Sequence, residues 1–346
     1  MLSAFGSNGS GQLGLGHDED VHDPSTTTIQ ENYTLARPQR IAAGGNHTSI
    51  LSADGAVFAA GDNSNGRCAF GTALESSSQF RPCSPAGSDS SNPITTCAAT
   101  WLASVFASDR QVFTCGTGAK GELGQGENTI ESAQAQPIPD FPPPDTRVID
   151  MAAGMNHVVA VLDNGDVYGW GNGRKGQFGE ATSIVWSPRK LSGISFPVCR
   201  AVCGREFTFV IGDPSQGQCA VLGADKWSIA SAAPKSVPGY IDVGAGWSNI
   251  YILQQDGSIL AWGRNNHGQL PPSNVPPIEA IAAGSEHVLA KTRDGKVLAW
   301  GWGEHGNCGL PIDDSGNVAG RWNEIQTSGP VEFIAAGCAT SFIFTS

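Results

Sequence analysis

Basic residues, and charged residues in general, are scarce in this sequence. Only 15% of its 346 residues are charged, and 20 Lys and Arg stand against 32 Asp and Glu, which gives a formal net charge of −12 at pH 7. Proteins that bind phosphate backbones gather Lys and Arg into patches, and the sequence contains no such cluster. The composition therefore argues against a nucleic acid as a direct ligand.

Other sequence signals are missing as well. No run of 18 or more apolar residues occurs, so no membrane-spanning helix is expected. The first expected strand begins at Leu2, which leaves no room for a secretory signal. We therefore expect a cytosolic location, with a nuclear location as an additional option. The nine cysteines are scattered without any Cys-x-x-Cys pair, so we expect small buried side chains rather than disulfides or metal ligands.

Glycine, in contrast, is abundant, with 45 residues, and much of it belongs to a repeated unit. The clearest copy is residues 281–310, in which a small-residue tract ends at Gly284 and an alternating run leads to Asp294-Gly295. A second alternating run follows and ends at Trp300-Gly301, before a Gly-rich return loop. Two period-two runs joined by Asp-Gly predict a β-hairpin with a tight turn.

The unit recurs seven times, with the residue that ends each tract (the anchor) 38 to 55 residues from the next. The expected anchors are Gly44, Ala99, Gly154, Gly204, Gly246, Gly284 and Gly337. Self-similarity at this period indicates a repeat array or a propeller. The expected blades are 41–71, 96–126, 151–180, 201–229, 243–270 and 281–310, with a seventh made of 333–346 and 2–16.

The two ends of the chain favour a closed ring. Residues 333–346 hold only the first half of a unit, and residues 2–16 hold only a second strand and its return loop. An open array would leave both halves with unpaired edges, whereas a ring removes the edges. We therefore predict an all-β fold, a single seven-bladed β-propeller domain over 1–346, closed by pairing the N-terminal strand with the C-terminal half-blade.

Four long connections separate the repeats, one of which is the polar insertion 311–332. The acidic stretch 17–23 is expected to be a solvated outer loop, residues 72–95 a Ser- and Pro-rich insertion, and residues 127–147 an extended, stiff linker. The outer strands of the blades are expected within such connections, but their patterning is too weak to predict boundaries.

Hairpin geometry separates two faces. The tract end and the return loop lie at one end of each blade, which we call the tract-side face, and the Asp-Gly turns lie at the other, the turn face. Because binding residues concentrate in loops on rigid scaffolds, we expect function on the tract-side face.

Histidine recurs three residues after the anchor at His47, His157 and His287, where the other copies are expected to have Leu102, Phe207, Asn249 and Thr340. Recurrence predicts a structural role, with a hydrogen bond to a neighbouring loop, rather than catalysis or metal binding. His305 and Cys308 lack the further ligands that zinc requires, so no metal site is predicted.

Paired acids such as Glu304 and Glu286 would need a substrate pocket that the sequence does not indicate, so no catalytic residue is predicted. Trp247 and Trp302 lie in loops and are either buried spacers or contact anchors, since tryptophan is enriched at interface hot spots.

The combination of AAGxxH, DGxVxxWG and GxLG resembles the regulator of chromosome condensation family of seven-bladed propellers, over nearly the whole chain. AFGSNGSGQLGLGHDED (4–20) and WGWGEHGNCG (300–309) resemble fungal members that partner a small four-cysteine zinc or iron protein. That resemblance implies a heterodimer without a cofactor of its own, supporting diphthamide biosynthesis and Elongator-dependent modification of the tRNA wobble uridine. The expected contact set is Trp247, Glu286, Trp302, Glu304, His305 and Asn307.

Two other functions remain open. The family's founding member implies guanine-nucleotide exchange on a Ran-like GTPase, although this sequence shows no basic targeting tail. The third hypothesis is an enzyme with its active site in the central channel, but no cluster of candidate catalytic residues in the sequence supports it.

Overall fold

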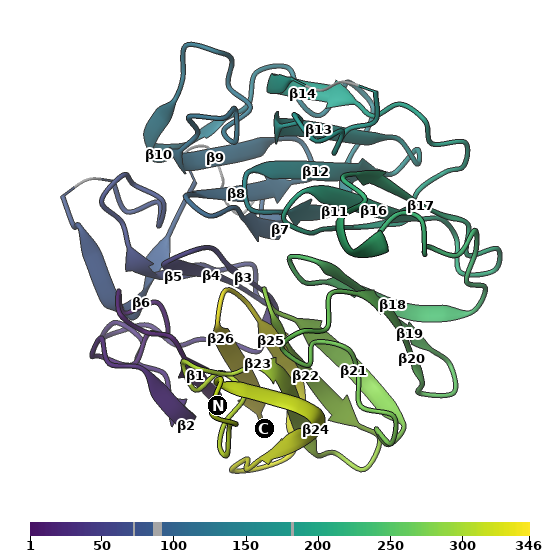
Figure 1. Ribbon diagram of the computed structural model, residues 1–346. Coiled ribbons are helices and arrows are strands. Elements are labelled where there is room, and N and C mark those ends of the chain that lie inside the picture. The colour runs from purple at the N-terminus through teal and green to yellow at the C-terminus, as the bar shows by residue number, and fades with distance from the viewer. Residues whose placement is uncertain (72, 86–91, 181–182) are drawn as a thin grey trace.

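The computed structural model of the protein describes residues 1–71, 73–85, 92–180 and 183–346. Seven antiparallel sheets are arranged in a ring around a central axis (Figure 1). Five sheets have four strands and two have three. The first strand of each repeat lies nearest the ring centre and the last lies at the rim (Figure 1). The predicted seven-bladed β-propeller is confirmed.

The strands of the first three blades follow the order of the chain. Blade one consists of β3 (Pro38–Ala43), β4 (His47–Ser52), β5 (Val57–Asp62) and β6 (Ser76–Cys83); blade two of β7 (Ile94–Ala99), β8 (Ala103–Ser108), β9 (Val112–Thr117) and β10 (Glu131–Pro137); blade three of β11 (Val148–Ala153), β12 (His157–Leu162), β13 (Val167–Asn172) and β14 (Ile184–Lys190).

The next four blades include the two with three strands. Blade four consists of β15 (Arg200–Cys203), β16 (Phe207–Ile211) and β17 (Cys219–Gly223), followed by the 3-10 turn η1 (Lys226–Ser228); blade five of β18 (Tyr240–Ala245), β19 (Asn249–Gln254) and β20 (Ile259–Gly263); blade six of β21 (Ile278–Ala283), β22 (His287–Thr292), β23 (Val297–Trp302) and β24 (Asn317–Ile325); blade seven of β25 (Val331–Ala336), β26 (Thr340–Thr345), β1 (Leu2–Gly6) and β2 (Val21–Thr26). The part of the chain that the structure describes holds no helix of the length and apolarity that a membrane crossing requires.

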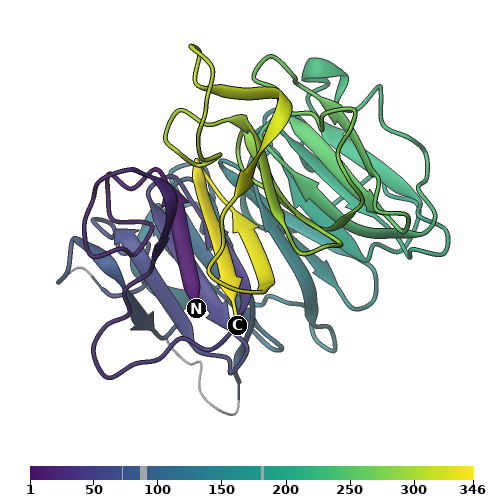
Figure 2. The same ribbon diagram turned by 90° about the horizontal axis from the view of Figure 1, so that it is seen from below.

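Blade seven closes the ring by joining the two ends of the chain. β1 pairs with β26 in antiparallel register from Leu2 opposite Phe344 to Gly6 opposite Thr340. Figure 2 shows the N-terminal strand beside the yellow C-terminal strands. The side chains of Leu2 and Phe5 are buried in this sheet, so the closure has an apolar core as well as a hydrogen-bonded ladder.

The outer strands β2, β6 and β10 lie in the connections between repeats, as expected. The acidic stretch 17–23 is not wholly a solvated loop, because β2 begins at Val21. β10 occupies part of the linker 127–147, and β6 lies in the insertion 72–95, of which residues 72 and 86–91 are outside the described residues.

The anchor prediction is wrong in blade two. In each blade the N–H of the anchor donates to the carbonyl three residues later, as from Gly44 to His47, and in blade two this pair is Thr100 and Ala103. Thr100 therefore takes the place expected for Ala99, and Ala103 the place expected for Leu102. The different anchor residue in blade two has a packing reason. In blade one a Cβ on Gly44 would lie 2.3 Å from the His47 ring, so the anchor must be glycine. In blade two the residue three positions later is Ala103, which leaves room for the threonine side chain.

Buried tryptophans at the ends of β13, β20 and β23 hold the return loop of the preceding blade. The Trp300 indole N–H donates to the Gln269 carbonyl at 3.1 Å, and the Trp170 indole N–H to the Glu122 carbonyl at 2.9 Å. The return loops of blades two, four and five are thus each fixed by the next blade.

Candidate functional site: the tract-side face

Seven short loops, one after each anchor, form a ring at the mouth of the channel. The first residues of these loops are Gly45, Trp101, Met155, Arg205, Trp247, Ser285 and Cys338. Four of these residues donate their backbone N–H to the carbonyl of the same position in the next blade, namely Gly45, Trp101, Arg205 and Trp247, with 3.0 Å from Gly45 to Trp101 and 2.7 Å from Trp247 to Ser285. The Ser285 N–H donates to the carbonyl of the next anchor, Gly337. The mouth is therefore a rigid ring in which the side chains at this position have fixed places.

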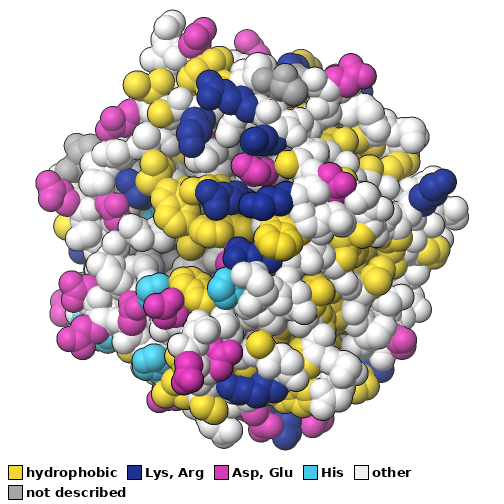
Figure 3. Space-filling view, in the orientation of Figure 1, with side chains coloured by type: hydrophobic (Ala, Val, Ile, Leu, Met, Phe, Trp, Pro, Cys, Tyr) yellow, Lys and Arg dark blue, Asp and Glu magenta, His cyan; other side chains and the backbone are white. Residues whose placement is uncertain are grey.

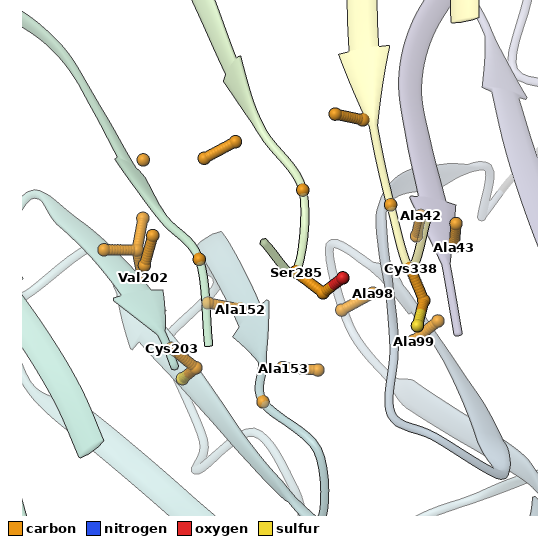
Figure 4. A pocket seen from close by; sticks show the side chains of 18 of the residues that line it. Ala42, Ala43, Ala98, Ala99, Ala152, Ala153, Val202, Cys203, Ser285 and Cys338 are labelled. Carbon is orange, nitrogen blue, oxygen red and sulfur yellow. The ribbon is translucent and has the colours of Figure 1, made fainter. Parts of the chain in front are cut away.

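The channel behind this mouth is narrow and lined by small side chains. It has a volume of about 280 Å³, and Figure 4 shows Ala42, Ala98 and Ala152 among the labelled residues around it. Trp101 and Trp247 meet at its mouth with ring centroids 5.7 Å apart. Small residues are needed here because seven strands converge on one axis.

Arginine side chains cross the channel near the turn face. A guanidinium nitrogen of Arg40 in blade one lies 3.1 Å from the carboxylate of Asp150 in blade three, and Arg200 in blade four lies 3.3 Å from the same carboxylate. Arg200 also pairs with Asp242 of blade five at 3.1 Å. The channel is thus obstructed by side chains at both ends, which disfavours the hypothesis of an enzyme inside it.

The recurrent histidines are buried and structural. Nε2 of His47 lies 2.9 Å from the Ser104 hydroxyl, and His287 makes the same contact with Ser341 at 2.9 Å. His157 contacts Thr208 at 3.2 Å. The predicted structural role is confirmed, except that the partner is a hydroxyl on a strand of the next blade, not a loop.

Burial also keeps these three imidazoles neutral. It lowers the pKa of His47 to about 3, with Arg67 acting in the same direction, and lowers the pKa of His157 and of His287 to about 4. At neutral pH the rings therefore carry no charge and act only as hydrogen-bonding groups.

Two residues of the expected contact set are buried. Glu286 is 8% exposed, and its carboxylate pairs with Arg264 at 2.8 Å and accepts a hydrogen bond from Gln269 at 2.6 Å. Asn307 is 0% exposed, and its amide donates to the Trp302 carbonyl at 2.7 Å. These two side chains hold the loops in place, so the expectation that they face a partner is corrected.

Three others lie together at the rim of blade six. The Trp302 ring packs edge-on against His305 with centroids 5.2 Å apart, and His305 Nδ1 lies 2.8 Å from a carboxylate oxygen of Asp20. Glu304 is exposed beside them. The structure thus brings Trp302, Glu304 and His305 together with the acidic stretch, and places Trp247 apart from them at the channel mouth.

A hollow between blades four and five was missed by sequence analysis. It is lined by Trp227 and Trp247 with Arg205, Lys226 and Arg264 around them. Trp227 is 46% exposed. The available signal was DKWS after Gly223, where a tryptophan replaces the usual Gly-rich return loop in an irregular copy.

Charge is unevenly distributed over the tract-side face. Figure 3 shows Lys and Arg side chains gathered among hydrophobic ones near its middle, and Asp, Glu and His side chains toward its lower left. The exposed cations include Arg174, Lys175, Arg205 and Lys226 in the loops of blades three and four and Lys120 in the return loop of blade two, and the acidic part includes Asp18, Glu19 and Glu304. The face therefore offers a partner two regions of different character.

Residues 1–345 match the sequence profile of the RCC1-like domain family. The chain belongs to the RCC1-like family. The RCC1 repeat-containing protein C10F6.04 of Schizosaccharomyces pombe is 33% identical over 285 residues, which cover 78% of each chain. The secretion-regulating guanine nucleotide exchange factor of Mus musculus is 29% identical over 294 residues, covering 78% of this chain and 61% of the mouse protein.

Among solved structures, Prp20p from Saccharomyces cerevisiae superposes with a TM-score of 0.83 at 20% identity, covering 99% of this chain and 90% of that one. At this identity the likeness shows the shared RCC1-like propeller fold. That fold fits a protein-interaction scaffold, because it presents many loops on one rigid ring.

Among the residues that the structure describes, no group of three or more His, Cys, Asp or Glu side chains is placed to hold a metal ion. Cys308 is buried with its thiol 3.6 Å from the Trp302 carbonyl, and burial raises its pKa well above the ordinary value. Since His305 pairs with Asp20 instead, the two residues of the His-x-x-Cys pattern have separate roles.

Proposed function

We propose that this RCC1-like propeller is a non-enzymatic scaffold that forms a heterodimer with a small four-cysteine zinc or iron electron-carrier protein. The tract-side face would cover part of the metal-binding region of that partner and so tune its access to larger enzymes. The propeller itself would carry no cofactor. The complex would support diphthamide biosynthesis and Elongator-dependent modification of the tRNA wobble uridine, in the cytosol and also in the nucleus.

One observation carries the proposal. The two stretches that resemble the fungal α-tubulin suppressor, also known as a killer-toxin-insensitivity factor, are residues 4–20 and 300–309, far apart in the chain. They meet on the tract-side face, where His305 lies 2.8 Å from Asp20. Residues that carry a resemblance and also share one exposed surface support a common binding role for that surface.

Affinity purification of the protein from its native cells, followed by metal analysis of the proteins that co-elute, tests the proposal. We expect a small protein that contains zinc or iron. Titration of that purified protein then measures the contact. Trp302→Ala and Trp247→Ala should each weaken binding by about 2 to 4 kcal/mol if they are hot spots, whereas Ile241→Ala, an exposed apolar residue at the turn-face end of β18, should leave it unchanged.

Failure to retain any metalloprotein would argue against the heterodimer. Unchanged binding in both tryptophan variants, with folding intact, would show instead that the partner uses another surface.

Guanine-nucleotide exchange on a Ran-like GTPase is the second candidate, and the similarity to the mouse exchange factor favours it. A nucleotide-release assay with purified Ran separates the two. If this protein accelerates nucleotide release from Ran, exchange activity is favoured. If the release rate is unchanged, the scaffold function remains as the supported proposal.

A further inference from the structure

The return loop of blade four differs from the loops of the other blades. After Gly223 the chain forms η1, in which Trp227 and Ser228 have φ angles of 62° and 57°. Non-glycine residues in this left-handed region carry strain, and such strain gathers at functional sites. Here the strained backbone holds the Trp227 indole at 46% exposure.

Trp227 forms one wall of the blade-four hollow, the space of about 280 Å³ between blades four and five. Lys226 Nζ lies 5.9 Å from the Trp227 ring centroid, and the Arg264 guanidinium lies 5.7 Å from it. Trp247 lines the same hollow with the Arg205 guanidinium 5.6 Å from its ring. Both indoles therefore stand beside cations.

The charges of the hollow are only partly compensated within the chain. Arg264 pairs with Glu286 at 2.8 Å. Over the described residues, Arg205 and Lys226 have no carboxylate within ion-pair distance, and Glu206 is the single lining carboxylate without a basic partner. In the described part of the chain, two cations and one carboxylate without an ion-pair partner thus line the hollow. The exposed Arg174 and Lys175 of the blade-three return loop lie outside this lining, on the same face.

We propose that the blade-four hollow binds an acidic peptide segment of a partner protein. Its carboxylates would pair with Arg205 and Lys226, and an apolar or aromatic side chain would pack on Trp227. Tryptophan and arginine are the residues most enriched at interface hot spots, and guanidinium groups match carboxylates in geometry. This inference rests on the proposed function in that the metalloprotein supplies the segment.

A nucleic-acid strand could use the same cations and stack on the same indoles. The observations favour a peptide, because Glu206 and Glu286 belong to the lining and the whole chain has a formal charge of −12. Both properties repel a phosphate backbone more strongly than a segment with a few spaced carboxylates.

The first arm of the test titrates the purified metalloprotein against the whole propeller at low salt. The double variant Arg205→Glu/Lys226→Glu should raise the dissociation constant about 30-fold or more, and Trp227→Ala should raise it about tenfold to 30-fold. Arg110→Glu/Lys235→Glu is the matched control. It makes the same charge change near the turn face, where Arg110 lies in the blade-two turn and the Lys235 carbonyl accepts the N–H of Cys219 at the start of β17.

The inference is supported if the control variant binds the metalloprotein as tightly as the wild type does and both hollow variants bind it more weakly. A metalloprotein that binds the wild type and all variants equally overturns the inference and leaves the heterodimer standing.

The second arm removes the metalloprotein from the test. The probes are a fluorescein-labelled peptide with a few glutamates spaced by glycines around one central tryptophan (the oligoglutamate peptide), its counterpart with lysines in place of the glutamates, and a single-stranded oligonucleotide of similar length. Only the oligoglutamate peptide should bind, and the hollow variants should abolish its binding. If it binds in this way while the metalloprotein does not bind at all, the inference stands and the proposed function fails.

Two outcomes of the second arm count against the acidic peptide. An oligonucleotide that binds more tightly than the oligoglutamate peptide, and is released by the same variants, assigns the hollow to nucleic acid. Absence of binding by both the oligoglutamate peptide and the metalloprotein overturns the inference entirely.

Discussion

At the scale of single residues, the anchor position shows how one side chain determines which residue type a neighbouring position can accept. The glycine anchors of blades one, three and six each lie over a histidine ring, and a Cβ on Gly284 would lie 2.3 Å from the His287 ring and 2.6 Å from the Gly337 carbonyl. Blade two has alanine at the histidine position and carries Thr100 at the anchor, whose hydroxyl accepts the Ala103 N–H at 3.0 Å. In these three blades the requirement for glycine is therefore set by the histidine ring three positions later together with the backbone carbonyl of the next blade.

Gly284→Val should destabilise the fold by about 1 to 3 kcal/mol, because the added side chain overpacks against the imidazole and the neighbouring carbonyl. Thr100→Val places the same side chain at an anchor that already accommodates a Cβ, and should cost only about 1 kcal/mol for the lost hydroxyl. Thermal melts of the two variants provide the measurement, and equal midpoints would contradict this account of the anchor.

At the scale of elements, the histidines connect β4, β12 and β22 to the second strands of the next blades. Their folded-state pKa values, about 3 to 4, lie below the value of about 6.5 in an unfolded chain. The unfolded state therefore binds protons that the folded state does not, so this stability is complete above about pH 6.5 and is lost as the pH falls toward the folded pKa.

Between about pH 7 and pH 5.5 each buried histidine should cost the fold about 1 kcal/mol. Urea unfolding at the two pH values measures the loss. In His287→Gln the loss should be smaller by one histidine's share, even if the variant is less stable overall. An undiminished pH dependence in that variant would mean that other groups cause it.

The elements also show what the sequence can and cannot predict. The inner strands and the closure of blade seven follow from alternation, Asp-Gly turns and two complementary half-units. The outer strands do not, because β2, β6 and β10 lie in polar connections with one exposed face, where the apolar pattern is weak. Within the site, Trp302 and His305 come together as their shared loop implies. The burial of Glu286 and Asn307 depends on neighbours from other loops, and the exposure of Trp227 depends on a local backbone that departs from the repeat.

At the scale of the whole molecule, one charged network links blades that are not neighbours. Asp150 has a side chain only 6% exposed, and it pairs with Arg40 and Arg200 while accepting the Ala201 N–H at 3.0 Å. Blades one, three and four are therefore connected across the channel as well as around the ring.

Asp150→Ala should destabilise the protein by about 2 kcal/mol, since it leaves the buried Ala201 N–H without its acceptor and removes the carboxylate that Arg40 and Arg200 share, although Arg200 keeps its pair with Asp242 and both arginines remain partly solvated. Asp163→Ala is the matched control, because Asp163 pairs with Arg147 at 3.3 Å on the surface, where solvent screens the pair, and its loss should cost clearly less than the loss of Asp150. Chemical denaturation of both variants distinguishes the two, and equal losses would show that the cross-channel network adds nothing.

The join between β1 and β26 also determines where attachments can be placed. Leu2 lies opposite Phe344, and the amino group of Met1 donates to the Thr345 carbonyl, so both termini emerge from blade seven at the turn face. A tether or fluorescent fusion at either terminus would leave the tract-side loops open to solution. A short linker between the two termini would permit circular permutation, with new ends cut in any turn-face hairpin.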